Sequence, residues 1–444
     1  MYMKLIYFIN PYKKVLTTVP DFLKDIYLKK KYYLLPKSKF LIKIIIFFYI
    51  KVFRKFFIFV ELLLKAKIIW KKPTKFKYII FDNQSLGVID KILPSKKYFV
   101  LVTRIQSFKE IYVTKEIILY IFKNFYKNSI KINYICCLIN IIKPKKIITI
   151  IDNSEDFHKI YKLFNKSNIS FYAIQNAYRN QKYFKDIFSI SNYSGNYFCF
   201  GNYELNSIKK NLAHKPQLRL KAIGSLRIEL AKEYLLRKNK KLNEIYDICL
   251  ISEAVSEIDN SGSLSKLQYE NAQKLQVLLL RHTLFFCKKY NKKLLFLGRH
   301  DLKRIGDHLN KEEEILFYKY KNKISDFNLQ FFDKSKFDNI KHLLQSKVVI
   351  GQVSTLLNES FGLKKKILVC DWEVKKIKKN FNTGYFPANG ILKLKSNNYN
   401  DFEKRLKQIL NMNYKQYLSK TINSKLIYNL NFKTLKFLRK EMKD

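Results

Sequence analysis

Short apolar runs that end in polar residues recur along most of the chain, and they limit its fold more than any other feature. Four such runs lie in the first half: Tyr78–Phe81, Tyr98–Val102, Lys146–Ile151 and Ile169–Ile174. Continuous β-branched and aromatic runs of this length are typical of parallel strands in a sheet that is covered on both faces. Helical stretches such as Glu110–Tyr126 separate the runs, so the pattern predicts a doubly wound α/β fold.

The same alternation begins again after the lysine-rich stretch Arg237–Asn243. The strands expected there are Asp247–Ser252, Lys293–Leu297, Leu329–Phe332, Lys347–Ile350 and Lys366–Val369. Because 444 residues are too many for one ordinary core, we predict two Rossmann-like α/β domains that face each other across a nucleotide-binding cleft. The expected parts are a helical N-terminal segment (1–72), an N-terminal Rossmann-like domain (73–235), a C-terminal Rossmann-like domain (236–412) and a helical C-terminal tail (413–444).

The chain is strongly basic, with 86 Lys and Arg against 35 Asp and Glu and a net charge of +51. Such a field favours anionic partners, among them acidic lipid headgroups and nucleotide phosphates. A second explanation is compositional, because the excess is mostly lysine and accompanies abundant Ile, Asn, Phe and Tyr, a set that AT-rich codons produce. The basic residues are spread along the whole chain, which argues against a specific nucleic-acid partner.

Most of the six cysteines lie in apolar runs and fit the core of a protein in a reducing compartment. No Cys/His spacing fits a zinc site, so we expect no metal and no cofactor. The first ten residues lack the features of a signal peptide, and no stretch offers the ~18 apolar residues of a membrane span. These observations predict a cytoplasmic protein.

The segment Phe40–Trp70 is apolar and aromatic but is interrupted by Lys43, Lys51, Arg54 and Lys55. At about 100° per residue these four cations fall within about a third of the helical circumference. That pattern is typical of a helix in a membrane interface, whose lysines meet acidic headgroups. A helix packed on the first domain with solvated lysines explains it equally, so peripheral membrane contact stays one of two hypotheses.

Polar residues follow several of the expected strands in the first domain. In doubly wound sheets ligands bind outside the carboxyl ends of the strands, so Asp82, Asp152, Gln175, Asn176 and Arg179 are candidates for that edge. For Asp152 and the two residues after it, capping of the following helix is the competing interpretation.

The sharpest local signal is a buried strand that ends at Gly351 and is followed by Ser354, Thr355 and, one turn later, Glu359. Glycine allows close approach of the backbone, and a helix N-terminus binds phosphate readily. An ordinary N-cap by Ser354 or Thr355 is the competing interpretation. The motif is no Walker loop, because no Gly-Lys-Ser/Thr follows it.

Arg299 and His300 follow the expected strand Lys293–Leu297 at the same edge of the second sheet. A cationic pair there could hold a diphosphate, or His300 could act as an acid or base. An exposed loop histidine is the competing interpretation.

In their order along the chain, these junctions resemble the GT-B enzymes of bacterial surface-polysaccharide assembly. The motifs that carry the resemblance are Gln175–Arg179, Phe200–Gly201, Ile223–Arg227, Leu297–His300 and Gly351–Glu359. The pattern is most similar to surface carbohydrate biosynthesis proteins. CDP-glycerol glycerophosphotransferases, capsule Kdo transferases and UDP-N-acetylglucosamine 2-epimerases are its wider relatives.

The resemblance implies a role for each matched position. Ser354 and Thr355 match a step that holds the donor's phosphates, and Glu359 matches an acidic residue near the donor's ribose or sugar. Arg299 and His300 match a basic element of the C-terminal domain.

Three motifs depart from the family pattern, one of them because no proline follows His300. Arg227 ends a Gly-Ser-Leu-Arg step where relatives have Gly-Asn-Pro-Arg. The Gln-His-Gly common in relatives is Gln175-Asn176-Ala177 here, so the usual histidine is missing.

These features together predict a metal-independent glycosyltransferase that uses a nucleotide-activated donor and a glycan or lipid-linked acceptor. Cations and helix dipoles would stabilise the charge that builds on the departing phosphate. The acceptor hydroxyl needs a base, and Asp82, Asp152 and Glu253 are the candidates. The competing hypotheses are a nucleotide-sugar epimerase and a non-enzymatic protein that binds polyanions or membranes.

Overall fold

In the computed structural model the chain forms two compact units, residues 1–72 with 104–114 and residues 73–103 with 115–444. The structure describes residues 66–103, 110–124, 126–179, 195–211, 218–237, 243–251, 266–297, 327–330, 338–352, 354–372, 389–422 and 433–443. Membrane contact was one hypothesis for the segment Phe40–Trp70. Residues 40–65 of that segment lie outside the described residues.

In the first unit the described elements are two short strands, β1 (Lys67–Ile69) and β4 (Glu110–Tyr112), which pair in parallel. The expectation of a continuous helix over Glu110–Tyr126 was wrong at its start. Residues 111–113 are Ile, Tyr and Val, which favour a strand, and Ile111 is buried between two more exposed neighbours.

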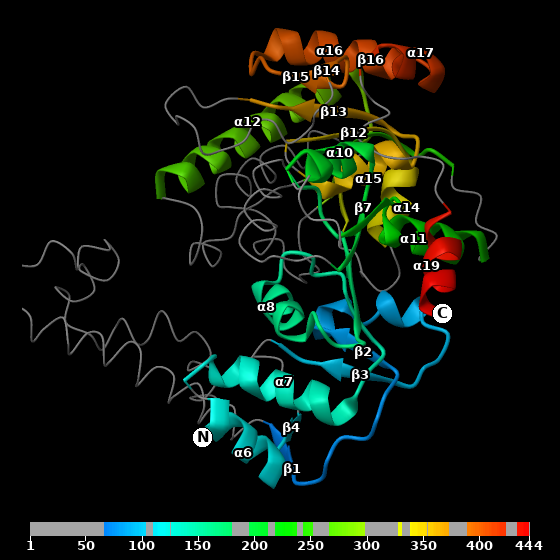
Figure 1. Cartoon of the computed structure of the whole chain (residues 1–444). Helices are drawn as coiled ribbons and strands as arrows, with labels where there is room; N and C mark the ends of the chain where they lie inside the picture. Colours follow the sequence, from blue (N-terminus) through cyan, green and yellow to red (C-terminus); the bar gives the residue numbers. More distant parts are fainter. Residues whose placement is uncertain are drawn as a thin grey trace, which may run out of the picture. The chain divides into compact units, whose positions relative to one another are not determined.

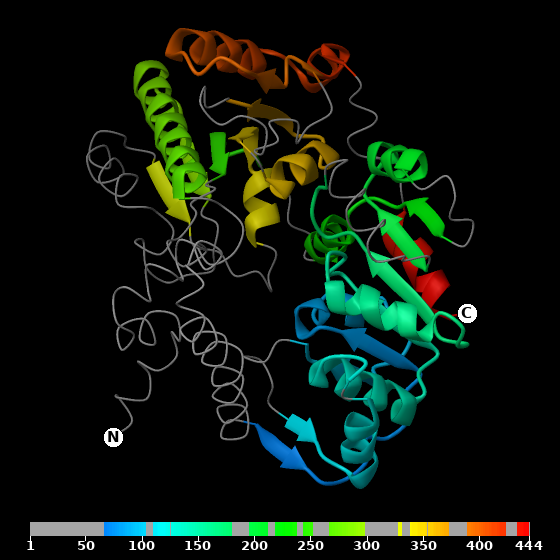
Figure 2. The same ribbon diagram turned by 60° about the vertical axis from the view of Figure 1, so that its left-hand side comes forward.

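The larger unit contains two six-stranded parallel sheets. The first, called the N-sheet, has the order β3-β2-β5-β6-β7-β8. Its strands are β2 (Tyr78–Phe81), β3 (Tyr98–Leu101), β5 (Lys146–Thr149), β6 (Ser170–Ile174), β7 (Asn196–Cys199) and β8 (Arg219–Ala222). Numbered within the sheet, the order is 2-1-3-4-5-6, which is the flavodoxin-like order with one strand added. Figure 2 shows these strands side by side, coloured blue through green.

The helices of the N-sheet follow its strands as doubly wound folds require. They are α6 (Lys115–Asn124), α7 (Ile130–Ile142), α8 (Glu155–Phe164), α10 (Asn202–Asn211) and α11 (Leu226–Arg237), with 3-10 turns η5 (Asn83–Ser85) and η6 (Ile89–Lys91). Helix α7 begins at the N-cap Ser129, whose hydroxyl accepts from Ile132 N. It ends at Lys143, which adopts the left-handed conformation at φ 52° and precedes Pro144. Proline cannot continue the helix, and the left-handed cap satisfies a terminal carbonyl.

The second sheet, called the C-sheet, has the order β11-β10-β9-β12-β13-β15. Its strands are β9 (Tyr246–Ile251), β10 (Leu294–Leu297), β11 (Phe327–Gln330), β12 (Ser346–Gly351), β13 (Lys366–Cys370) and β15 (Lys393–Leu394). Numbered within the sheet, the order is 3-2-1-4-5-6, which is that of dinucleotide-binding Rossmann domains. The larger unit thus contains the two predicted Rossmann-like α/β folds, which together make up the GT-B architecture, and this prediction is confirmed. The strand expected at Leu329–Phe332 begins two residues earlier.

Helices and a small two-stranded sheet complete this half of the unit (Figure 1). They are α12 (Lys266–Tyr290), α14 (Asp338–Leu344), α15 (Thr355–Gly362), α16 (Tyr399–Asn411), α17 (Tyr414–Ser419) and the antiparallel pair β14 (Asn389–Gly390) and β16 (Thr421–Ile422). Among the described helices none is both long and apolar enough to cross a membrane.

The last helix, α19 (Thr434–Lys443), packs on the N-sheet although it follows the C-sheet in the chain. The Tyr78 hydroxyl donates to Met442 O at 3.0 Å, and Lys146 Nζ donates to Glu441 O at 2.6 Å. Arg219 binds the Glu441 carboxylate through two hydrogen bonds of 2.7 and 2.8 Å. Helix α19 is therefore part of the N-sheet's cover.

Candidate functional site

The C-sheet reverses its strand order between β9 and β12, which is where Rossmann-type sheets bind their ligands. Strand β9 ends at Ile251 and β12 ends at Gly351, so both carboxyl ends meet at this point. A Cβ atom on Gly351 would lie 3.2 Å from Leu357 Cδ1 and 3.5 Å from Ile251 Cβ. The small residue thus allows α15 to pack tightly on the strand end, and the predicted junction of strand, glycine and helix is present.

Helix α15 begins at Ser354, which acts as its N-cap. The Ser354 hydroxyl accepts a hydrogen bond from Leu356 N at 3.3 Å, and its backbone is extended at φ −130° and ψ 139°. The capping interpretation therefore holds for Ser354. Thr355 instead accepts from Tyr178 N at 3.1 Å through its Oγ1 atom. That bond joins the first turn of α15 to the loop that follows β6 of the N-sheet.

Hydrogen bonds within the loop after β6 and to neighbouring segments hold this loop in place. Gln175 accepts from Phe200 N at 3.0 Å and donates to Ala177 O at 2.8 Å. Arg179 binds the Asp152 carboxylate through Nε at 3.1 Å and Nη2 at 2.9 Å, and donates to Asn176 Oδ1 at 3.3 Å. The structure therefore brings together four residues that the sequence had selected, namely Asp152, Gln175, Asn176 and Arg179.

The carboxylate of Asp152 is fully buried, and its oxygen atoms already accept hydrogen bonds from other residues. Besides Arg179 it accepts from the Tyr197 hydroxyl at 2.9 Å and from Asn176 N at 3.5 Å. It does not cap α8, because Ser154 takes that role by accepting from Phe157 N. Its contacts are those of an anchor for the loop after β6.

Asp82 follows β2, beside the point where the N-sheet reverses its own order between β2 and β5. Its backbone has φ 72° and ψ 130°, a conformation that residues other than glycine rarely adopt. Its carboxylate accepts from Thr103 Oγ1 at 2.5 Å and from Gln84 N at 2.9 Å. Strained backbone of this kind costs of order 1–3 kcal/mol and clusters at functional sites.

Glu359 is buried on α15 and contacts the turn after β8. Its Oε1 accepts from the Ser225 hydroxyl at 2.8 Å, while Oε2 has no hydrogen-bond partner among the described residues. Burial raises the pKa of Glu359, and the nearby Arg227 guanidinium and the Ser225 hydroxyl oppose that rise. Ser225 also caps α11 by accepting from Ile228 N at 3.3 Å. A second contact thereby joins α15 to the carboxyl edge of the N-sheet.

One buried acid was not selected from the sequence. Glu204 lies in the first turn of α10, directly after β7, and is fully buried. Burial raises its pKa to about 8, although its backbone N–H and the Gln175 side chain counteract part of the rise. From the sequence alone, an acidic residue in the first turn of a helix is expected to be exposed and to interact favourably with the helix dipole. Nothing in the sequence pattern therefore indicated that Glu204 is buried.

Three candidates, Arg299, His300 and Glu253, lie outside the described residues. Within the described ranges no group of His, Cys, Asp and Glu is placed to hold a metal ion. The cysteines, which are all described, are buried and free, as expected of core residues.

No protein-family model matches the chain, and no curated protein matches it either. Among solved structures, a UDP-GlcNAc 2-epimerase from Neisseria meningitidis is similar, at 12% identity and a TM-score of 0.48, over 83% of this chain and 99% of that one. The wall teichoic acid polymerase TagF is similar at 13% identity and 0.46, over 83% and 88%. A sucrose-phosphate synthase from Thermosynechococcus elongatus follows at 12% and 0.41, over 82% and 87%. The resemblance to UDP-GlcNAc 2-epimerases expected from the sequence thus recurs among the neighbours, but likenesses this distant assign no activity to the chain.

Proposed function

We propose that this protein is a metal-independent glycosyltransferase of bacterial surface-polysaccharide biosynthesis. It transfers a sugar or a polyol phosphate from a nucleotide-activated donor to a glycan or lipid-linked acceptor. One observation carries the proposal. Helix α15 begins at the switch point of the C-sheet and is hydrogen-bonded to two loops at the carboxyl edge of the N-sheet. A ligand at this helix would contact both halves of the unit.

The donor's phosphates are proposed to bind at the first turn of α15, beside Ser354 and Thr355. The positive end of the helix dipole favours an anion there. Arg227, whose charge already acts on Glu359, would stabilise the charge that develops on the leaving phosphate. Arg299 and His300 are proposed to add cationic groups from the C-sheet.

Glu359 is proposed to bind hydroxyl groups of the donor's ribose or sugar. Its Oε2 atom is buried and without a hydrogen-bond partner among the described residues, which is costly unless a ligand supplies a donor. Gln175, Asn176 and Arg179 would complete the site from the N-sheet, with Arg179 oriented by Asp152.

Asp82 is the favoured base for the acceptor hydroxyl. It follows strand β2 at the carboxyl edge of the N-sheet, beside the point where the strand order reverses, and is held in a strained conformation. Asp152 is less suited, because four hydrogen bonds already engage its two oxygen atoms. Closure of the two halves would exclude water and so limit hydrolysis of the donor. We further propose a cytoplasmic location, with the basic N-terminal segment contacting an acidic membrane face.

A thermal-shift screen against CMP-, CDP-, UDP- and GDP-linked sugars tests the donor site, because a ligand that binds the folded state raises its melting temperature. We expect one nucleotide class to raise the melting temperature and Ser354→Ala to remove that rise. Ser129→Ala is the matched control, since it deletes the N-cap of α7 and leaves α15 intact. If Ser354→Ala and Ser129→Ala respond alike to every compound, α15 is not the donor site.

A turnover assay separates the reaction classes. A transferase releases free nucleotide only when an acceptor is present. Interconversion of two nucleotide sugars without an acceptor would indicate the epimerase, and salt-sensitive polyanion binding with no response to sugar nucleotides would indicate a non-enzymatic binder.

A further inference from the structure

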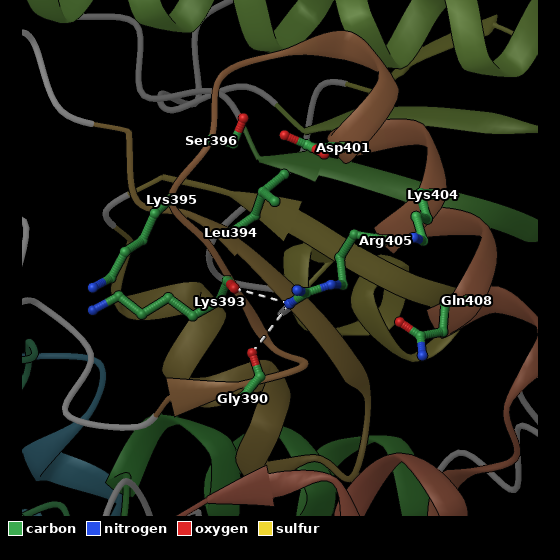
Figure 3. Close-up of a pocket in the computed structure, with 9 residues that line it drawn as sticks. All are labelled: Gly390, Lys393, Leu394, Lys395, Ser396, Asp401, Lys404, Arg405 and Gln408. Carbon is green, nitrogen blue, oxygen red and sulfur yellow. Dashed lines mark hydrogen bonds between the residues drawn. The ribbon is translucent and has the colours of Figure 1, made fainter.

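A basic pocket lies between the end of β15 and helix α16, apart from the first turn of α15 (Figure 3). Its volume is about 630 Å³, within the ~300–1,000 Å³ that is usual for small-ligand sites. The lining residues are Gly390, Lys393, Leu394, Lys395, Ser396, Asp401, Lys404, Arg405 and Gln408. The set has four cationic side chains and one carboxylate, so the pocket carries an excess of positive charge.

Among the described residues only Lys393, of these four cations, has a counter-ion. The Lys393 ammonium binds Asp371 at 2.8 Å, and both side chains are nearly buried. Lys395 and Lys404 are exposed, and within the described part of the chain neither forms an ion pair. Like charges that share a concave surface repel one another, and a bound anion would relieve that repulsion.

Arg405 is held in place at the centre of the pocket (Figure 3). Its Nη1 atom donates to the backbone oxygens of Gly390, Ile391 and Lys393 at 3.1, 3.0 and 3.0 Å. Those bonds use one nitrogen of the guanidinium and fix its plane, which leaves the N–H groups of Nε and Nη2 for a ligand. A fixed guanidinium binds phosphoryl oxygens with little loss of side-chain entropy.

The lining also indicates what the ligand is not. Among the described lining residues Leu394 has the one apolar side chain, and none carries an aromatic ring on which a nucleobase could stack. The neutral polar members are Ser396 and Gln408, which can each hydrogen-bond an oxygen atom. The chemistry therefore suits a small, hydrophilic and highly charged group.

We propose that this pocket binds a phosphoryl anion at a site separate from α15. The anion is either a free phosphate or a segment of a phosphodiester chain. Lys395, Lys404 and Arg405 contact its oxygens. This site does not depend on the proposed transferase activity.

Isothermal titration of the full chain with inorganic tripolyphosphate at 0.15 M NaCl tests the site. We expect Lys395→Ala/Lys404→Ala to weaken binding at least tenfold. The matched control is Lys288→Ala/Lys415→Ala, which removes the same charge from two exposed lysines outside the pocket. It should bind within twofold of the wild type. Equal weakening in both variants, or no binding to the wild type, would overturn the proposal.

Two further arms locate the anion and identify its source. Ser354→Ala should retain the tripolyphosphate-binding event that Lys395→Ala/Lys404→Ala weakens. A loss of that event in Ser354→Ala alone would place the anion at α15 and would overturn the pocket proposal, but not the proposed transferase. Orthophosphate distinguishes the sources. A site that spans several linked phosphoryl groups, as a phosphodiester segment would supply, should bind tripolyphosphate at least tenfold more tightly than orthophosphate. A site for a single phosphate should bind both alike.

Discussion

Arg179 donates two hydrogen bonds to the Asp152 carboxylate, and the two side chains are 14% and 0% exposed. Because Asp152 follows β5 and Arg179 lies in the loop after β6, the pair fixes that loop against the neighbouring strand. The same loop reaches Thr355 through Tyr178 N. The orientation of the proposed donor site thus depends on a buried ion pair in the other half of the unit.

Removal of the Arg179 guanidinium should destabilise the protein. Arg179→Met leaves the buried Asp152 carboxylate without its cation, a change that typically costs about 3–5 kcal/mol. Adding Asp152→Asn should restore part of the loss, which urea unfolding would measure. The control is Lys131→Met at the partly exposed Lys131–Asp156 pair, where a loss below about 1 kcal/mol is expected. Equal losses at the two pairs would contradict the anchoring role.

Thr355→Val should release the loop after β6. The substitution keeps the shape of the side chain but removes the oxygen that accepts from Tyr178 N. Leaving a buried donor unsatisfied costs about 1–3 kcal/mol. Hydrogen exchange at the Tyr178 amide should therefore accelerate. Thr283→Val, which loses a hydroxyl bond within α12, should leave that amide protected.

Gly351→Ala should move the start of α15. The added Cβ would stand 3.2 Å from Leu357 Cδ1, so the leucine tip must yield by a few tenths of an ångström. Overpacking of this kind costs about 1–3 kcal/mol. We expect a lower melting temperature and a smaller thermal shift with the donor. A variant with the wild-type donor shift would show that α15 tolerates the methyl group.

Glu204 should make stability depend on pH. Its pKa is about 8 when folded against 4.5 in the reference state, so the folded protein holds the proton more tightly. The stabilisation is present below about pH 4.5 and is lost as the pH rises through 8, by on the order of 4 kcal/mol. Glu204→Gln should flatten the unfolding free energy over this range. The exposed Glu155→Gln should retain the wild-type slope.

Asp82→Asn should abolish most of the turnover without affecting donor binding. A general base typically contributes 10²–10⁴-fold, so kcat should fall by about that factor. The thermal shift with the donor should persist, because the amide retains a similar shape. Asp156→Asn on the surface of α8 serves as the control. Unchanged kcat in Asp82→Asn would assign the base elsewhere.

The sequence predicted the two sheets well because a buried parallel strand is a local signal. Runs such as Lys146–Ile151 and Lys347–Ile350 consist mostly of β-branched residues, and the structure has strands within one or two residues of them. The junction of strand and helix at Gly351 and Ser354 was predicted equally well, because a strand, a glycine and an N-cap lie within a few positions of one another. Strands of two residues, such as β14 and β16, have no period that a pattern could reveal.

Long-range partners escaped the sequence analysis for a physical reason. Burial of Glu204 and the carbonyl cage around Arg405 depend on residues brought together by folding, and neither has a local signature. The Ser225–Glu359 bond joins positions 134 residues apart. For Asp152 the sequence found the right edge of the sheet, but its engagement by Arg179 and Tyr197 became visible only in three dimensions.

Helix α19 also bears on how the chain is made. The bond between Tyr78 and Met442 joins residues 364 positions apart. On the ribosome, strand β2 must therefore wait until the chain 364 positions further on has been synthesised before α19 can cover it. Until then the apolar residues that α19 covers are exposed, and such exposure makes an incomplete chain prone to aggregation. A nascent chain halted before α19 would be a substrate for quality control, however well its second sheet had formed.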